Sequence, residues 1–156
     1  MKKLILILVG LMPALFGFAQ SNVEEVDFVQ SIYGMEKKVI IEEFVQVSES
    51  NKSAFWEVYD KYEAERKGLG KERISLLEDF GEKYETMTNA EADAWMKKVI
   101  SLSKKQSKLI DTYYVKVKKV TSPIVAMRFY QVESFLLTAI RLEILDAIPF
   151  VEDKNE

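Results

Sequence analysis

The chain has 156 residues, of which 48% are hydrophobic and 30% charged, and its net charge is −3 at pH 7. It contains no cysteine and no histidine. Disulfide frameworks, thiol nucleophiles, metal sites built on thiolate or imidazole, and serine–histidine triads are therefore excluded.

The first segment has the pattern of an export signal. Two lysines precede an apolar run over 4–16, and the small residues Gly17 and Ala19 stand where a signal peptidase cleaves. The run is short for a membrane span, although a membrane anchor is the alternative. We expect residues 1–19 to be a signal peptide cleaved after Ala19. The mature chain, 20–156, is then a single helical domain with a net charge of −5, periplasmic or secreted.

Hydrophobic residues spaced by three and four predict helices along nearly all of the mature chain, and no strand pattern occurs. The expected helices cover about 28–47, 49–86, 89–119 and 122–147. In the second, the apolar stripe keeps its phase across Gly68 and Gly70, which favours one long helix softened at the glycines over two helices. Such a helix is longer than a compact domain of this size is wide. We therefore expect an all-α fold, an elongated antiparallel helical hairpin or bundle of about four helices.

Hydroxyl residues precede three of these helices. Ser48 can cap the second helix, and Thr88 forms a capping box with Glu91. Ser122 can cap the last helix, with Pro123 at its first position. Capping accounts for the pattern, so no chemical role is assigned to these hydroxyls.

Two of the helix starts also resemble a family motif. Val-Ser-x-x-Asn at 47–51 and Met-Thr-x-x-Glu at 87–91 look like degenerate LTxxQ motifs of the exported, helical Spy/CpxP-like proteins. Segments 54–62 and 126–133 are similar to small exported helical proteins of Bacteroidetes type, some labelled sensors of extracytoplasmic sigma factors, and this likeness covers about 35–151. The resemblance implies an all-α fold and a role in binding, with no reaction attached.

The last helix is apolar around most of its circumference, which predicts burial on more than one side. Within it the charged and amide residues Arg128, Gln131, Glu133, Arg141 and Glu143 stand out. A charge in such surroundings must be paired. Arg66 and Arg73 of the second helix are candidate partners for its acids, and Glu63 for its arginines. We interpret these residues as a structural polar network that fixes helix register, with signal or ligand sensing as the alternative.

The third helix is strongly basic. Its lysines over 97–119 are Lys97, Lys98, Lys104, Lys105, Lys108, Lys116, Lys118 and Lys119. Asp111 is the only acid among them, so the stretch carries a local charge of +7. A solvated face explains this pattern, and a surface for an anionic partner is the functional alternative. Trp56 and Tyr114 lie beside the main apolar stripes, so they complete the candidate partner surface.

No catalytic residue, cofactor or metal site is predicted, because neighbouring acids point in different directions on a helix and no phosphate loop occurs. The leading hypothesis is a non-enzymatic binding protein, a Spy/CpxP-like periplasmic chaperone or envelope-stress sensor. Its partner would be an unfolded client or an envelope regulator. The alternative is a structural or adaptor protein acting through one fixed partner or self-association, for example as a homodimer. A hydrolase working through carboxylates is a remote third option. Neither nucleic acid nor a membrane span after signal cleavage is expected.

Overall fold

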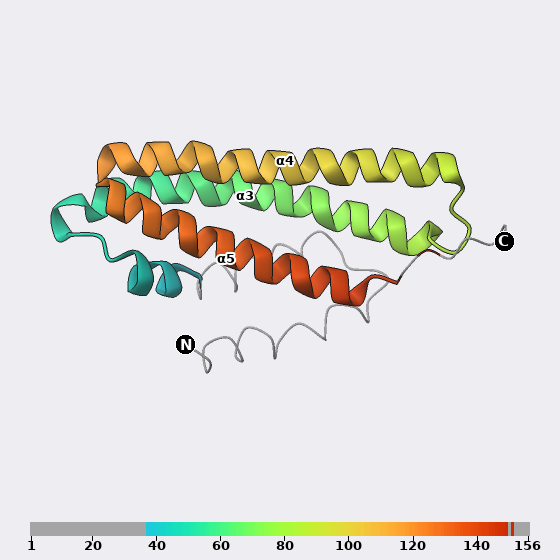
Figure 1. Cartoon of the computed structure of the whole chain (residues 1–156). Helices are drawn as coiled ribbons and strands as arrows, with labels where there is room; N and C mark the ends of the chain where they lie inside the picture. The colour runs from blue at the N-terminus through green and yellow to red at the C-terminus, as the bar shows by residue number, and fades with distance from the viewer. Residues whose placement is uncertain (1–36, 150, 152–156) are drawn as a thin grey trace. The chain divides into compact units, whose positions relative to one another are not determined.

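The computed structural model describes residues 37–149 and 151. Within them every regular element is a helix: a segment over 37–45, then α3 (Glu49–Lys83), α4 (Asn89–Val120) and α5 (Pro123–Ala147). Figure 1 shows α3 and α4 antiparallel and side by side, with α5 packed along α4. The predicted all-α antiparallel bundle is confirmed. The expected signal peptide and the first part of the expected helix 28–47 lie outside the described residues.

α3 runs without a break for 35 residues through both glycines of its middle, about 52 Å at the usual rise per residue. The continuous apolar stripe therefore predicted one helix correctly. A Cβ added at Gly68 would meet nothing within 4 Å, so packing does not require a glycine there. The helix ends at Lys83 rather than at 86, because a turn closes with the Thr86 N–H donating to the Lys83 carbonyl at 3.0 Å.

The helix before α3 ends two residues earlier than predicted, at 45. Gln46 has φ 53°, in the left-handed region that a continuing helix cannot use. Ser48 then stands at the N-cap position of α3 as expected, but its side chain accepts no N–H of the first turn. Its Oγ lies 3.1 Å from the Oγ of Ser50 instead, so the predicted side-chain cap is wrong.

The two other predicted caps are confirmed. The Glu91 N–H donates to Thr88 Oγ1 at 3.3 Å, and the Thr88 N–H donates to the Glu91 carboxylate at 2.9 Å. The Thr88 N–H and the Thr88 hydroxyl, at 2.7 Å, both donate to this carboxylate and hold the pKa of Glu91 below its ordinary value. At the start of α5 the Val125 N–H donates to Ser122 Oγ at 3.3 Å, and Pro123 follows the cap. Both helix starts therefore satisfy an otherwise free N–H.

The core is densest where α3 begins, α4 ends and α5 begins. Tyr62 of α3 meets Tyr113 of α4 and Phe129 of α5, each with ring centroids 5.3 Å apart. Ile41 and Val45 are fully buried, so segment 37–45 closes this end of the core. Edge-to-face aromatic contacts of this kind stabilise a core beyond the area they bury.

Candidate binding surface

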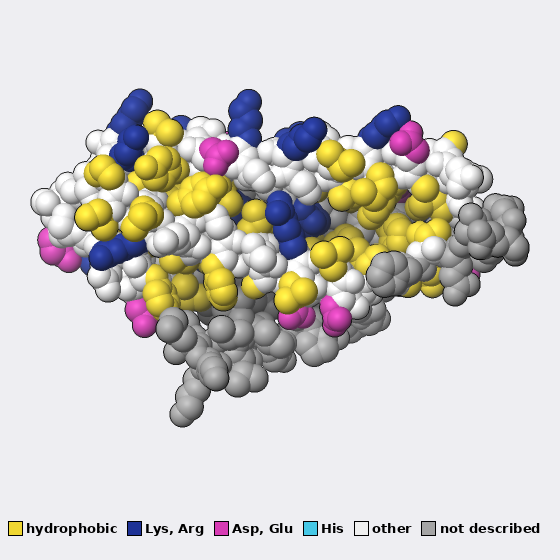
Figure 2. Space-filling view, in the orientation of Figure 1, with side chains coloured by type: hydrophobic (Ala, Val, Ile, Leu, Met, Phe, Trp, Pro, Cys, Tyr) yellow, Lys and Arg dark blue, Asp and Glu magenta, His cyan; other side chains and the backbone are white. Residues whose placement is uncertain are grey.

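The basic stretch of α4 lies at the surface. All eight lysines are exposed: Lys97, Lys98, Lys104, Lys105, Lys108, Lys116, Lys118 and Lys119. Lys97 pairs with Asp93 at 2.6 Å, and Lys105 pairs with Glu72 of α3 at 2.8 Å. The other six form no ion pair within the part of the chain that is described. Basic side chains line the α4 edge in Figure 2, so this edge presents positive charge to solvent.

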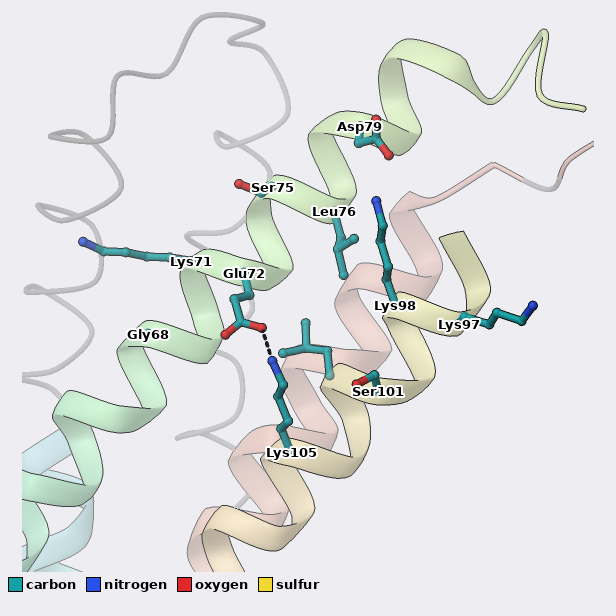
Figure 3. A pocket seen from close by; sticks show the side chains of 11 residues that line it. Gly68, Lys71, Glu72, Ser75, Leu76, Asp79, Lys97, Lys98, Ser101 and Lys105 are labelled. Atoms are coloured by element: carbon teal, nitrogen blue, oxygen red, sulfur yellow. Dashed lines mark hydrogen bonds and ion pairs between the residues drawn. The ribbon is translucent and has the colours of Figure 1, made fainter. Parts of the chain in front are cut away.

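A shallow groove of about 720 Å³ lies between α3 and α4. Figure 3 shows the Lys105–Glu72 pair bridging it and Lys98 reaching toward Asp79. Acids of α3 therefore face bases of α4 across the groove.

α5 packs against α4, α3 and segment 37–45, but one of its sides carries exposed hydrophobic residues. Its large hydrophobic residues with at least 40% exposure are Ile124, Met127, Tyr130, Phe135, Leu142 and Leu145. Leu142 and Leu145 are the most open of them, at 67% and 71%. In Figure 2 hydrophobic side chains gather over α5 and along its border with α4.

The aromatic residues expected at the surface lie elsewhere. Trp56 is half-buried and packs edge-on against Phe55 and Tyr59, with ring centroids 5.2 and 5.3 Å away. Tyr114 is also half-buried, 6.1 Å from the ring of Tyr130. Both pack against the core, so they are not the exposed apolar contacts predicted. The exposed hydrophobic residues of α5 were missed because periodicity identifies a helix but not the side that its neighbours cover.

Glu133 is the centre of a buried polar cluster. It is 2% exposed, and Lys37 Nζ donates to its Oε2 at 2.8 Å. The hydroxyls of Tyr62 and Tyr59 donate to the same carboxylate at 2.6 and 3.3 Å. Lys37 also donates to Glu63 at 2.5 Å, so one ammonium group joins two carboxylates. Segment 37–45, α3 and α5 are thereby held in one register.

The electrostatics of the cluster follow from these contacts. Burial alone would raise the pKa of Glu63, but Lys37 and Arg66 outweigh it and hold that pKa below its ordinary value. Arg66 donates through Nε and Nη2 to the two Glu63 oxygens at 2.8 and 3.1 Å. Burial and the nearby Glu133 raise the pKa of the Tyr62 hydroxyl, so Tyr62 stays a neutral donor.

The predicted partners were therefore partly wrong. Arg66 binds Glu63 of its own helix, and the cation on Glu133 is Lys37, 96 residues away in the chain. Lys37 stands beside Lys38, which is exposed, and residue type does not distinguish the two. The apolar spacing that places Ile41 and Val45 on the core face is the one signal that puts Lys37 on the same side, one turn earlier.

The remaining members of the predicted network do not join this cluster. Gln131 is exposed, and Glu143 is half-buried with no ion pair in the described part. Arg128 donates to Gln46 Oε1 at 3.2 Å, which ties α5 to the loop before α3. Arg73 donates to Gln106 Oε1 at 2.6 Å, a buried glutamine that sequence reasoning had missed. Arg141 has no acid partner among residues 37–149.

The described residues also lack the arrangements that a metal site or a membrane-spanning helix needs. They contain no group of three or more acidic side chains placed to hold a metal ion. None of their helices is both long and apolar enough to cross a membrane. No family model, curated protein or solved structure matches the chain.

Proposed function

We propose that the protein is an exported, non-enzymatic helical binding protein of the Spy/CpxP-like kind, a chaperone or envelope-stress sensor. Its partners would be acidic, partly unfolded protein segments. One observation carries the proposal: α5 keeps six large hydrophobic side chains exposed beside the basic edge of α4. A contiguous apolar patch next to like charges is typical of a surface that binds another protein.

The geometry of α5 supports this reading. Three of these residues form a row along one side of the helix, because Phe135 follows Ile124 by 11 residues and Leu142 follows Phe135 by seven. Met127 and Leu145 lie about one turn after Ile124 and Leu142. An extended or partly folded segment could lie along this row and place acidic side chains against α4. Exposed lysines attract such a segment over about 10 Å at moderate salt and release it as salt rises.

An aggregation assay tests the apolar half of the proposal. Reduced α-lactalbumin serves as an acidic client that aggregates once unfolded, and the protein should suppress its light scattering at equimolar ratio. The double variant Leu142→Ser/Leu145→Ser should lose most of this effect. Val39→Ser removes a side chain of similar exposure (66%) from segment 37–45 and is the matched control. No suppression by the unaltered protein would contradict the proposal.

A second pair of variants tests the charge. Lys98→Gln/Lys119→Gln removes two exposed α4 lysines that have no ion pair in the described part. Lys52→Gln/Lys61→Gln removes the same charge from α3, where both lysines are paired with acids. Client binding should weaken and lose part of its salt dependence only in the α4 variant. Equal effects would show that net charge, rather than the α4 edge, governs binding.

Self-association or one fixed partner is the second candidate, and the same exposed leucines favour it. A second copy of the chain could cover these leucines and form a homodimer. The substitution Leu142→Ser should then dissociate that dimer. Light scattering across a concentration series measures the mass directly. A stable dimer that is indifferent to unfolded clients would favour the adaptor role over the chaperone role.

A further inference from the structure

Two arginines of the bundle lie near one another, with no acid paired to either among residues 37–149. Burial lowers the pKa of Arg73, on α3. The positive charge of Arg141, on α5, lowers it further. Arg73 Nη2 donates to Gln106 Oε1 at 2.6 Å, a neutral acceptor. Neither guanidinium has a carboxylate partner within 37–149. The site therefore holds two positive charges that repel one another.

Three N–H groups of this pair are buried without an acceptor: Arg73 Nε, and Arg141 Nε and Nη2. Native proteins rarely leave such donors unpaired. Nε and Nη2 of one arginine are parallel donors, and their spacing matches two oxygens of a carboxylate or a phosphate. The Arg141 fork thus has the geometry of one oxyanion-binding site.

Arg141 also lines a shallow groove of about 440 Å³ between α4 and α5. The polar lining from α4 consists of Ser103, Lys104, Ser107, Lys108 and Asp111. The two lysines are one turn apart, so their ammonium groups lie on the same side of α4. With Arg141 they outnumber Asp111, which leaves the groove positive. Figure 2 shows basic side chains between α4 and α5, surrounded by hydrophobic ones.

We propose that this groove binds a small oxyanion, a carboxylate or a phosphate group, on the Arg141 guanidinium. On binding, the Arg141 guanidinium turns toward the groove that this side chain already lines. Its Nε and Nη2 groups then donate to the oxygens of the anion. Lys104 and Lys108 attract the anion at the groove mouth. Val99 and Ile100, which also line the groove, can contact a hydrocarbon chain attached to it. The site shares Lys104 and Lys108 with the basic edge of α4, but its central group, Arg141, is not part of the proposed client surface.

Calorimetric titration with inorganic phosphate and with octanoate, at constant ionic strength set by chloride, tests the proposal. Saturable binding in the millimolar range or tighter is expected. Arg141→Gln should weaken it by about tenfold or more, because a hydrogen-bonded charge is lost. Arg128→Gln is the matched control, since Arg128 belongs to the same helix and already has an acceptor in Gln46. Equal binding by these two variants, or no saturable binding, would overturn the proposal.

Thermal unfolding in a chloride buffer without phosphate or carboxylate gives a second readout. Arg141→Gln should not lower Tm relative to Arg128→Gln, because it removes an unpaired buried charge and its repulsion of Arg73. A lower Tm would mean that Arg141 is paired within the folded protein, which overturns the proposal. The surface variant Lys104→Gln should weaken binding about twofold, whereas Lys119→Gln, outside the groove, should leave it unchanged. Loss of equal size in both would also count against the site.

The two probes distinguish the sources of the anion. Binding of phosphate alone identifies a free oxyanion as the ligand. Much tighter binding of octanoate places a hydrocarbon chain against Val99 and Ile100 and identifies an amphiphilic carboxylate. Either result supports the site.

Discussion

Replacing Glu133 by glutamine is expected to lower the free energy of unfolding by about 2–4 kcal/mol. The carboxylate is 2% exposed and accepts from Lys37 at 2.8 Å, Tyr62 at 2.6 Å and Tyr59 at 3.3 Å. Glutamine has the same shape, but it carries no charge and its amide nitrogen cannot accept a hydrogen bond. One buried donor is therefore left without an acceptor.

The magnitude follows from what the cluster retains. Removing one partner of a buried ion pair costs about 3–5 kcal/mol when the other charge is left alone. Here Lys37 keeps Glu63 at 2.5 Å, and the glutamine oxygen can still accept from a tyrosine. The variant loses only one charged contact and leaves one donor without an acceptor. The expected cost is therefore about 2–4 kcal/mol, less than that of leaving a buried charge alone. A domain is stabilised by about 5–15 kcal/mol in total, so the change is readily measured.

Urea unfolding followed by circular dichroism measures this loss. Glu143→Gln is the control, because Glu143 lies on the same helix, is half-buried and has no ion pair in the described residues. It should change stability by no more than about 0.5 kcal/mol. Combining Glu133→Gln with Lys37→Met should give a coupling energy above about 1 kcal/mol. A loss below about 1 kcal/mol, or additive effects in the double variant, would refute the reasoning.

Three further predictions concern local features. Thr88→Ala removes the capping box and should cost about 1 kcal/mol, whereas Ser48→Ala should cost almost nothing because its side chain accepts no N–H; equal losses in thermal melts would contradict this. Gly68→Ala should stabilise the protein by about 0.5–1 kcal/mol, since its Cβ meets nothing within 4 Å, and a lower urea midpoint would disprove it. The folded-state pKa of Glu63 lies below its ordinary value of 4.5, so the unfolded chain binds the proton first as pH falls. The stability that Glu63 contributes is present above that value and is lost as pH falls through the lower folded-state pKa. Glu63→Gln should therefore show a shallower loss of stability with acid, and parallel pH curves for the two proteins would count against it.

Much of the fold could be predicted because its signals are local. Hydrophobic spacing identified the helices, and its unbroken phase predicted that α3 passes through Gly68. Thr88 and Glu91 cap α4 within four residues of chain, so no distant contact is needed. The predictions failed where local signals compete. The turn at Gln46 and the unused Ser48 hydroxyl both depend on how the chain enters α3.

The candidate site was less predictable. The sequence identified the basic stretch of α4. Burying a lysine without a partner is costly, so these side chains lie at the surface however the helices pack. It could not identify which side of α5 stays open, because Leu142 and the buried Leu136 are equally apolar and differ only in what packs against them. Nor could it show that Arg73 and Arg141 would come near one another with no acid paired to either among residues 37–149.

The sequence by itself therefore determined an all-α chain with one strongly basic helix and one nearly apolar helix. Backbone hydrogen bonds within a helix join residues four apart, so the residues that specify it are close in the chain. The tertiary structure alone decided that Lys37 neutralises Glu133 across 96 residues and that α5 keeps an uncovered apolar side. Those outcomes depend on the crossing and register of packed helices, which no short stretch of sequence encodes.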